Sequence, residues 1–120
     1  MNDSWNLADV WETIADTVGH APAVICGDLV RTWSEFEQRA ARLAGVFDRY
    51  SIGHQSKVAH YLYNGPEYLE ATFASFKQRA VPVNVNYRYT DAELSYLFAN
   101  SDAEAIVVDA SFLDHVIRLL

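Results

Sequence analysis

The chain has 120 residues, of which 51% are hydrophobic and 21% are charged, so its composition is that of one folded domain and not of a disordered or fibrous chain. The net charge of −7, without a basic stretch, argues against binding to nucleic acid or to an anionic membrane surface. A single cysteine (Cys26), no apolar run long enough to span a bilayer and no signal-peptide pattern predict a cytoplasmic protein.

The first 33 residues predict a helix followed by a β-hairpin. Asn6 is the expected N-cap, and Gly19 is the expected end of the helix. Two short strands at 23–26 and 29–33 flank Gly27 and Asp28, a pair that suits a two-residue hairpin turn. The apolar residues expected on one face of this first helix are Leu7, Val10, Trp11, Ile14 and Val18.

A second helix is predicted from Ser34 to about Tyr50. Ser34 and Glu37 match a capping box, in which the hydroxyl and the carboxylate each accept a hydrogen bond from the other residue's amide. Apolar residues then recur on one stripe, and charged residues lie elsewhere. Ser34 is therefore interpreted as a cap and not as a nucleophile.

The stretch from Tyr61 to Leu94 is expected to be the centre of the fold. The mostly apolar run 58–63 predicts a strand that is buried on both faces, as in a parallel sheet. Pro66, after Asn64 and Gly65, marks a helix start. The next strand, 81–85, contains Pro82, which lacks an amide and should lie at the strand start or on a sheet edge. The buried stripe expected on the intervening helix is Leu69, Phe73, Phe76 and Ala80.

The last part of the chain continues the alternation of strands and helices. Thr90 and Glu93 form another capping box, and a turn at 100–103 leads to a buried strand at 105–108 and a helix from Phe112. This order predicts an α/β fold: a mostly parallel sheet with helices on both faces, right-handed crossovers and a short N-terminal hairpin.

No catalytic constellation is evident, so no catalytic, cofactor-binding or metal-binding residue is assigned. Arg88 could meet an anionic ligand or an acidic partner, but a salt bridge or a stacking contact is the favoured interpretation. The residues that lack compact metal-ligand spacing are His20, His54, His60, His115 and Cys26. The tyrosines that could line an acyl pocket, or more simply be core and surface residues, are Tyr61, Tyr63, Tyr68, Tyr87, Tyr89 and Tyr96.

Several segments, in order, resemble motifs of the N-terminal part of an adenylate-forming (AMP-binding) acyl-CoA synthetase. The likeness extends roughly from Asn6 to Asp109 and is greatest to the fatty-acyl-CoA synthetase branch. The matching segments are 31–36 ("Leu-Thr-Tyr-x-Glu-Leu"), 39–44 ("Arg-Ala-Asn-Arg-Leu-Ala") and 76–90 ("Lys-x-Gly-Ala-Val-x-Val-Pro-Leu-Asn" and its continuation "Asn-x-Arg-Leu-Thr"). The segments 63–68 and 84–88 are most similar to the fatty-acyl-CoA synthetase branch.

This resemblance implies that residues 1–120 are the N-terminal part of the large AMP-binding domain. The complete family enzyme adenylates a fatty or other carboxylic acid with ATP and Mg, and CoA then displaces AMP. The chain has no glycine after Gly65, so it lacks the family's Gly-rich ATP loop, and it also lacks the aromatic-Gly-x-Thr-Glu motif and the C-terminal domain with the catalytic lysine. We therefore expect a truncated segment that binds none of these cofactors and is inactive alone.

Two other functional interpretations are considered. The first is a non-catalytic interaction module that binds itself or a full-length synthetase through exposed apolar surface. The second, a free-standing flavodoxin-like binding domain, is disfavoured because no Gly-rich phosphate turn is present.

Three positions depart from the family pattern. Gln55 stands where a second glycine is usual, His60 where an aliphatic residue is usual, and Arg79 where glycine is more common. We expect these differences to affect loop geometry and local core packing.

Overall fold

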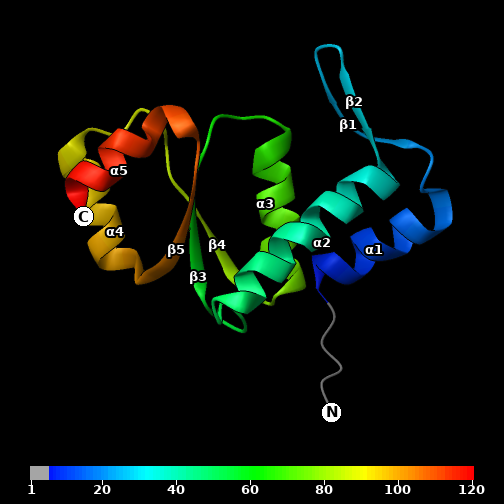
Figure 1. Ribbon diagram of the computed structural model, residues 1–120, viewed down its shortest axis with the longest axis horizontal. Coiled ribbons are helices and arrows are strands. Elements are labelled where there is room, and N and C mark those ends of the chain that lie inside the picture. The colour runs from blue at the N-terminus through cyan, green and yellow to red at the C-terminus, as the bar shows by residue number, and fades with distance from the viewer. Residues whose placement is uncertain (1–5) are drawn as a thin grey trace.

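The computed structural model describes residues 6–120, and Figure 1 shows their arrangement. Residues 1–5, within which the sequence predicts no targeting signal, lie outside the described residues. The predicted order of elements is confirmed. In chain order they are α1 (Leu7–Val18), β1 (Pro22–Cys26), β2 (Leu29–Thr32), α2 (Trp33–Arg49), β3 (Lys57–Tyr61), α3 (Pro66–Lys77), β4 (Val81–Asn84), α4 (Asp91–Ser101), β5 (Ala103–Val108), η1 (Ala110–Phe112) and α5 (Leu113–Leu119).

The centre of the molecule is a parallel three-stranded sheet in the order β4-β3-β5. One face, with Val58, packs against α2 and α3. The other face, with Ala59 and Tyr61, packs against α4, η1 and α5, and Figure 1 shows these two groups of helices on opposite sides of the strands. The predicted α/β fold with helices on both faces is thus confirmed, because alternate residues of β3 point into two separate cores.

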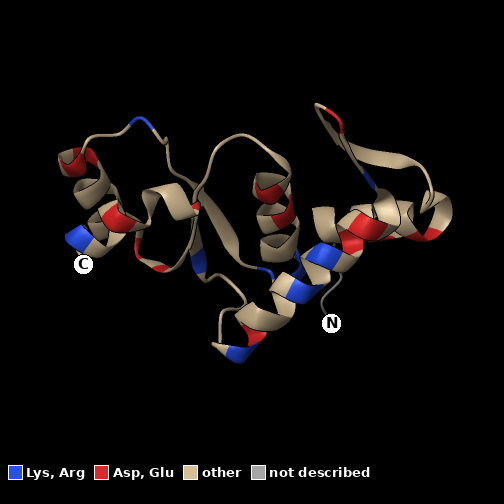
Figure 2. Ribbon diagram, turned by 45° about the horizontal axis from the view of Figure 1, so that its top comes forward, with Lys and Arg blue, Asp and Glu red and all other residues tan. Residues whose placement is uncertain are grey.

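A third core joins α1, α2, α3 and the hairpin. The Trp11 ring meets Phe73 edge-on at 5.1 Å, and Phe36 lies 5.0 Å from Phe73. Val24 of the antiparallel β1–β2 hairpin packs into the same cluster. Lys77 of α3 lies 2.6 Å from Glu12 of α1, and 2.5 Å from Glu37 of α2, so one cation links the three helices. Figure 2 shows the Lys and Arg positions distributed over several elements of the ribbon.

The predicted cap of α2 is wrong by two residues. The N-cap is Thr32, whose hydroxyl accepts from the Glu35 amide while the Glu35 carboxylate accepts from the Thr32 amide. The sequence holds two overlapping Ser/Thr-x-x-Glu patterns, and pairing of β2 as far as Thr32 selects the first. The Ser34 amide instead donates to the Gly19 carbonyl, and the carboxylate of Glu37 is bound to Lys77.

The expected buried faces of α1 and α3 are also shifted. Leu69, expected inside, is 41% exposed. The buried residues of α3 include small and polar ones, because this helix packs on the sheet, on α1 and on α2 at once. On α1 the buried residues are the small Ala8 and Ala15, and Ala8 packs in the cluster shared with α2 and α3. The α1 residues expected inside but found exposed are Leu7, Val10 and Val18.

Two of the three departures from the family pattern occupy left-handed backbone positions. Gln55 has φ +67° and Arg79 has φ +58°, a region that glycine adopts without strain. The two residues are joined by a backbone hydrogen bond, in which the Gln55 amide donates to the Arg79 carbonyl at 2.9 Å. Arg79 also donates to the side chains of Asn6 and Asp9 at 3.2 Å, so it holds the first turn of α1.

Candidate functional site

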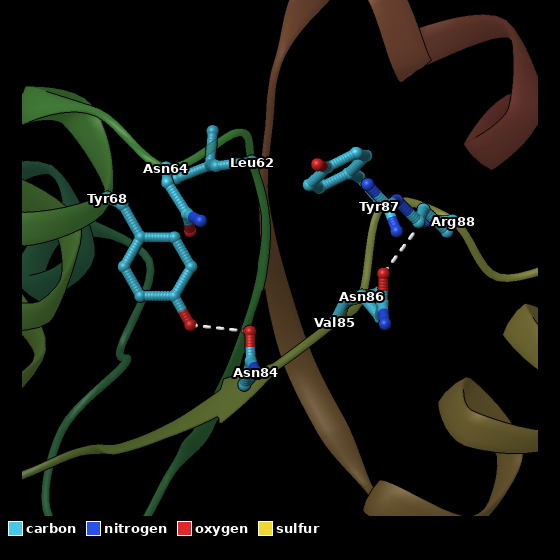
Figure 3. A pocket seen from close by; sticks show the side chains of 8 residues that line it. All are labelled: Leu62, Asn64, Tyr68, Asn84, Val85, Asn86, Tyr87 and Arg88. Carbon is cyan, nitrogen blue, oxygen red and sulfur yellow. Dashed lines mark hydrogen bonds between the residues drawn. The ribbon is translucent and has the colours of Figure 1, made fainter.

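A polar pocket lies where β3 and β4 end, at the carboxyl edge of the parallel sheet. In open α/β sheets this edge is where ligands usually bind. The pocket has a volume of about 270 Å³ and opens to solvent. Figure 3 shows the side chains that line it. Its lining residues are Leu62, Asn64, Tyr68, Asn84, Val85, Asn86, Tyr87 and Arg88.

Side chains from α3, β4 and the segment after β4 fix the shape of this pocket. The Tyr68 hydroxyl donates to Asn84 Oδ1 at 2.6 Å (Figure 3). Burial raises the pKa of Tyr68, so the phenol keeps the proton that it donates. Asn86 Oδ1 accepts from the Arg88 amide at 2.9 Å, an Asx turn that ends the extended segment. Both asparagines therefore have one oxygen engaged and an amide group left to donate.

Arg88 supplies the only positive charge of the pocket lining. Its guanidinium lies 5.6 Å from the ring centroid of Tyr87, which agrees with the favoured stacking interpretation. Within residues 6–120 no salt bridge of Arg88 is found, and the residue is exposed. The pocket thus presents a solvated cation and several amide donors, a combination that suits an anionic group.

The six tyrosines do not share one pocket. Tyr61 is buried and stacks on Phe112 at 4.5 Å with an interplanar angle of 5°. Tyr63 is 48% exposed and contacts both Phe112 and Tyr87. A separate groove along α4, of about 420 Å³, includes Tyr89 and Tyr96. Core and surface roles therefore account for their positions better than a single acyl pocket does.

His60 is fully buried in β3, next to the pocket. Its Nε2 atom lies 3.1 Å from Ser75 Oγ, and the Ser75 hydroxyl donates to the Ala71 carbonyl at 2.8 Å. Because that hydroxyl has one proton, it accepts from His60 Nε2–H, and the lone pair is then on Nδ1. Nδ1 is buried and has no partner within the described residues. Burial lowers the pKa of His60 to about 4, so the ring is neutral at pH 7.

Glu70 is the buried carboxylate on the same side of the sheet. Its Oε2 atom lies 2.5 Å from Arg39 Nε and 3.8 Å from Arg31 Nε. These two ion pairs hold α3 against α2 and against the hairpin, so we interpret Glu70 as a structural residue. The apolar pattern of the sequence did not predict the burial of Glu70, because that pattern places the preceding residue, Leu69, in the core.

The remaining candidate residues are not brought together. Cys26 lies exposed on the hairpin, and His115 Nδ1 lies 3.1 Å from Asp91 Oδ1, between α5 and α4. Across residues 6–120, no three His, Cys, Asp or Glu side chains form a group that could hold a metal ion. In the same range no helix has both the length and the apolar character needed to cross a membrane.

Sequence reasoning missed Asn84 and Asn86 as pocket residues, whereas Tyr68 and Tyr87, two of the tyrosines considered for an acyl pocket, line this polar pocket. A usable signal was present, because two asparagines at 84 and 86 lie at the end of a predicted parallel strand. The hydrogen bond from Tyr68 to Asn84 could not be predicted from the sequence, because the two side chains meet only after α3 has packed on the sheet.

Comparisons with known sequences agree with this fold. The family model for AMP-binding enzymes matches residues 11–119. A "Medium/long-chain-fatty-acid--CoA/3-oxocholest-4-en-26-oate--CoA ligase" of Mycobacterium marinum is 38% identical over 115 residues, which cover 96% of this chain and 21% of that protein. The "Medium-chain acyl-CoA ligase Mig" of Mycobacterium avium is 32% identical over 98% of this chain and 24% of its own length. The chain therefore spans about a fifth of the length of the curated relatives it matches.

Solved structures show the same arrangement of elements. A benzoate CoA ligase from Burkholderia xenovorans LB400 superposes with a TM-score of 0.89 at 21% identity, over 97% of this chain and 24% of that one. The N-terminal domain of FACL13 from Mycobacterium tuberculosis gives a TM-score of 0.89 at 20% identity, over 96% and 29% of the two chains. With a family model that covers nearly the whole sequence, the chain belongs to the AMP-binding enzyme family.

Proposed function

We propose that the chain is the N-terminal segment of an ATP-dependent fatty-acyl-CoA ligase. In the complete reaction, a carboxylate attacks the α-phosphate of ATP, giving an acyl-adenylate and pyrophosphate. The CoA thiol then attacks the acyl carbon, forming the thioester and releasing AMP. The observation that carries the proposal is the match over 96% of the chain to a relative named as a fatty-acid–CoA ligase.

Residues 6–120 do not by themselves fit ATP with its magnesium. The pocket at the carboxyl edge has one cation, Arg88, and no Gly-rich loop, since no glycine follows Gly65. A triphosphate needs backbone amides or several cations at close range. No step of the reaction is therefore assigned to this segment, whose role in a complete enzyme is to support the sites for nucleotide and acid.

Within that role, the pocket has one chemical capacity. Arg88 and the amide groups of Asn84 and Asn86 form a surface for one anionic group of a substrate. Because Arg88 is exposed in this chain, further contacts to its guanidinium in a complete enzyme would come from the remainder of the ligase. Contact with an anion is one of the roles that the sequence allows for Arg88, and it is compatible with the stacking of Arg88 on Tyr87.

The proposal is tested on the purified 120-residue protein. We expect no fatty-acid-dependent exchange of pyrophosphate into ATP, with a full-length ligase of the family as the positive control. Exchange above the level of a heat-denatured sample would contradict the proposal that this segment has no adenylation activity by itself.

We also propose that the protein is cytoplasmic. Cell fractionation tests this location, and recovery of the protein with membranes would count against it.

The alternative function is a non-catalytic interaction module. It is motivated by exposed apolar side chains, among them Ile25 (69% exposed) and Ile117 (61% exposed). If the module binds itself, sedimentation should show a concentration-dependent dimer. A strict monomer that unfolds in one two-state transition would argue against self-association.

A further inference from the structure

His60 places a polar ring in the core between the sheet and α3. The side chains of His60 and Ser75 are both fully buried, and alternation along β3 puts His60 on the same face as Val58. The family resemblance implies an aliphatic residue at position 60, so this polar contact is a feature of this chain and not of the family pattern. The His60 Nδ1 atom has no partner within residues 6–120. A buried nitrogen without a partner is uncommon in a native core and calls for an explanation.

A continuous set of contacts leads from His60 to the pocket at the carboxyl edge. The His60 ring meets the Tyr68 ring edge-on, with centroids 5.6 Å apart and an interplanar angle of 84°. The Tyr68 hydroxyl donates to Asn84 at 2.6 Å (Figure 3), and Asn84 is the register partner of His60 on β4. Tyr68 and Asn84 line the pocket, whereas His60 does not. Tyr68 therefore separates the buried ring from the pocket.

The two ends of α3 are held with different strength. Tyr68 and Ser75 lie about two helical turns apart, so both face the sheet, one near each end of the helix. At the far end, Lys77 is bound to carboxylates of α1 and α2. At the pocket end, α3 begins at Gly65, which provides no side-chain capping bond, beside a cavity that opens to solvent. Local opening is therefore expected at the pocket end.

A proton on the His60 ring would find no compensating charge. The elements packed around the ring contribute uncharged side chains to this face of the sheet, namely Tyr68 and Ser75 on α3, Asn84 on β4, Val107 on β5, and Leu43 and Phe47 on α2. Glu70, the buried carboxylate on this side of the sheet, is bound to Arg39. Burial alone lowers the pKa of His60 to about 4, which agrees with this apolar and uncharged environment.

We propose that His60 is a positioning residue for the pocket: its neutral ring supports the Tyr68 side chain that holds Asn84, and proton uptake by the ring favours an opening of this wall in which the rest of the fold stays intact. The charged ring reaches solvent when Tyr68 and the first turn of α3 move away from the sheet. This role belongs to the chain's own pocket and does not depend on the reaction proposed for the complete enzyme.

Native-state amide exchange of the ¹⁵N-labelled 120-residue protein tests the proposal. Two amides report the opening: that of Val85, which donates to the His60 carbonyl at 3.2 Å, and that of Tyr68, which donates to the Gly65 carbonyl at 3.1 Å. The amide of Ala44, in the middle of α2, reports global unfolding. Each exchange rate is divided by the intrinsic rate at the same pH, so that only the opening equilibrium remains.

We expect the Val85 and Tyr68 amides to exchange through an opening that is more frequent than the one that exposes Ala44. The constant of this local opening should rise at least about tenfold between pH 7.5 and pH 5.0, because the opened ring takes up a proton that the closed ring does not. Two results would overturn the proposal. One is an opening of Val85 and Tyr68 that coincides with that of Ala44, and the other is a local opening that does not change with pH.

Two variants separate the positioning role from the protonation of the ring. His60→Gln keeps a donor for Ser75 Oγ but does not titrate, so it should keep the Asn84 side-chain amide signals at pH 7.5 and lose the rise in local opening. His60→Ala removes the ring that Tyr68 contacts, so the Asn84 signals should shift. Unchanged Asn84 signals in His60→Ala, or an undiminished rise in His60→Gln, would contradict the proposal. If His60→Ala does not fold, the comparison of His60→Gln with the unaltered chain decides.

Discussion

Protonation of His60 should destabilise this protein as the pH falls below neutrality. The ring is fully buried in β3, and only Nε2 has a partner, the Ser75 hydroxyl. A proton added at Nδ1 would create a buried charge with no acceptor beside it within the described residues. Burial accordingly lowers the pKa of His60 to about 4, from an ordinary value of 6.5.

The sign and the size follow from linkage. Between pH 6.5 and 4 the unfolded chain binds a proton at this residue and the folded chain does not, so the free energy of unfolding falls as the pH falls. The contribution of the neutral His60 ring to the free energy of unfolding is fully present above pH 6.5 and is lost as the pH falls toward 4. A difference of about 2.5 pKa units corresponds to about 3 kcal/mol, of which about 2 kcal/mol is lost by pH 5.

The assay is urea unfolding at pH values from 7.5 to 4.5, for the unaltered chain and for His60→Leu. Leucine restores the aliphatic side chain that the family resemblance implies here, and Ser75 keeps its hydrogen bond to the Ala71 carbonyl. The difference between the two proteins should grow by about 2–3 kcal/mol over this range in favour of the variant. Parallel pH profiles would refute the reasoning, because they would mean that His60 titrates equally in both states.

Three further predictions concern the caps, the left-handed positions and the pocket. Thr32→Ala should lower the free energy of unfolding, measured in urea, by about 1 kcal/mol, whereas Ser34→Ala should change it by less than about 0.5 kcal/mol. A larger loss of stability in Ser34→Ala than in Thr32→Ala would identify Ser34 as the cap. Gln55→Gly should raise the free energy of unfolding by about 0.5–1 kcal/mol, because glycine adopts a positive φ without strain. Arg79→Gly should raise it by less, because this variant also loses the contacts of Arg79 with α1. A loss of stability in Gln55→Gly would contradict the strain argument. In a fusion of the chain to the rest of a ligase, Arg88→Ala should raise the KM of one anionic substrate about tenfold, with partial rescue by lysine; unchanged KM values for acid, ATP and CoA would exclude the ligand role.

The sequence predicted most of the fold because its local signals agree with one another. Pro66 after Gly65, the Thr90–Glu93 capping box and the apolar run in β3 each specify one element, and their order specifies a parallel sheet. Errors arose where two patterns overlapped, as at Thr32 and Ser34, or where packing used small residues, as at Ala8 in α1. Those choices depend on neighbouring elements, which local patterns do not contain.

The candidate site was less accessible to sequence reasoning. Arg88 was noticed as a cation between aromatic residues, and its stacking on Tyr87 agrees with the favoured interpretation. The hydrogen bond from Tyr68 to Asn84 joins residues 16 positions apart, so it depends on how α3 packs on the sheet. Gln55 and Arg79 stood out only as departures from a family pattern, and their positive φ values give the physical reason that glycine is common there.

The central claim is tested most directly by replacing the matching segment of the Mycobacterium marinum ligase with this chain. The fusion is assayed for fatty-acid-, ATP- and CoA-dependent thioester formation, beside the 120-residue protein alone and the unaltered ligase. We predict that the fusion is active and that the isolated chain is not. A fusion that folds, as judged by circular dichroism and cooperative melting, but forms no thioester would contradict the claim that this chain is the N-terminal segment of such an enzyme.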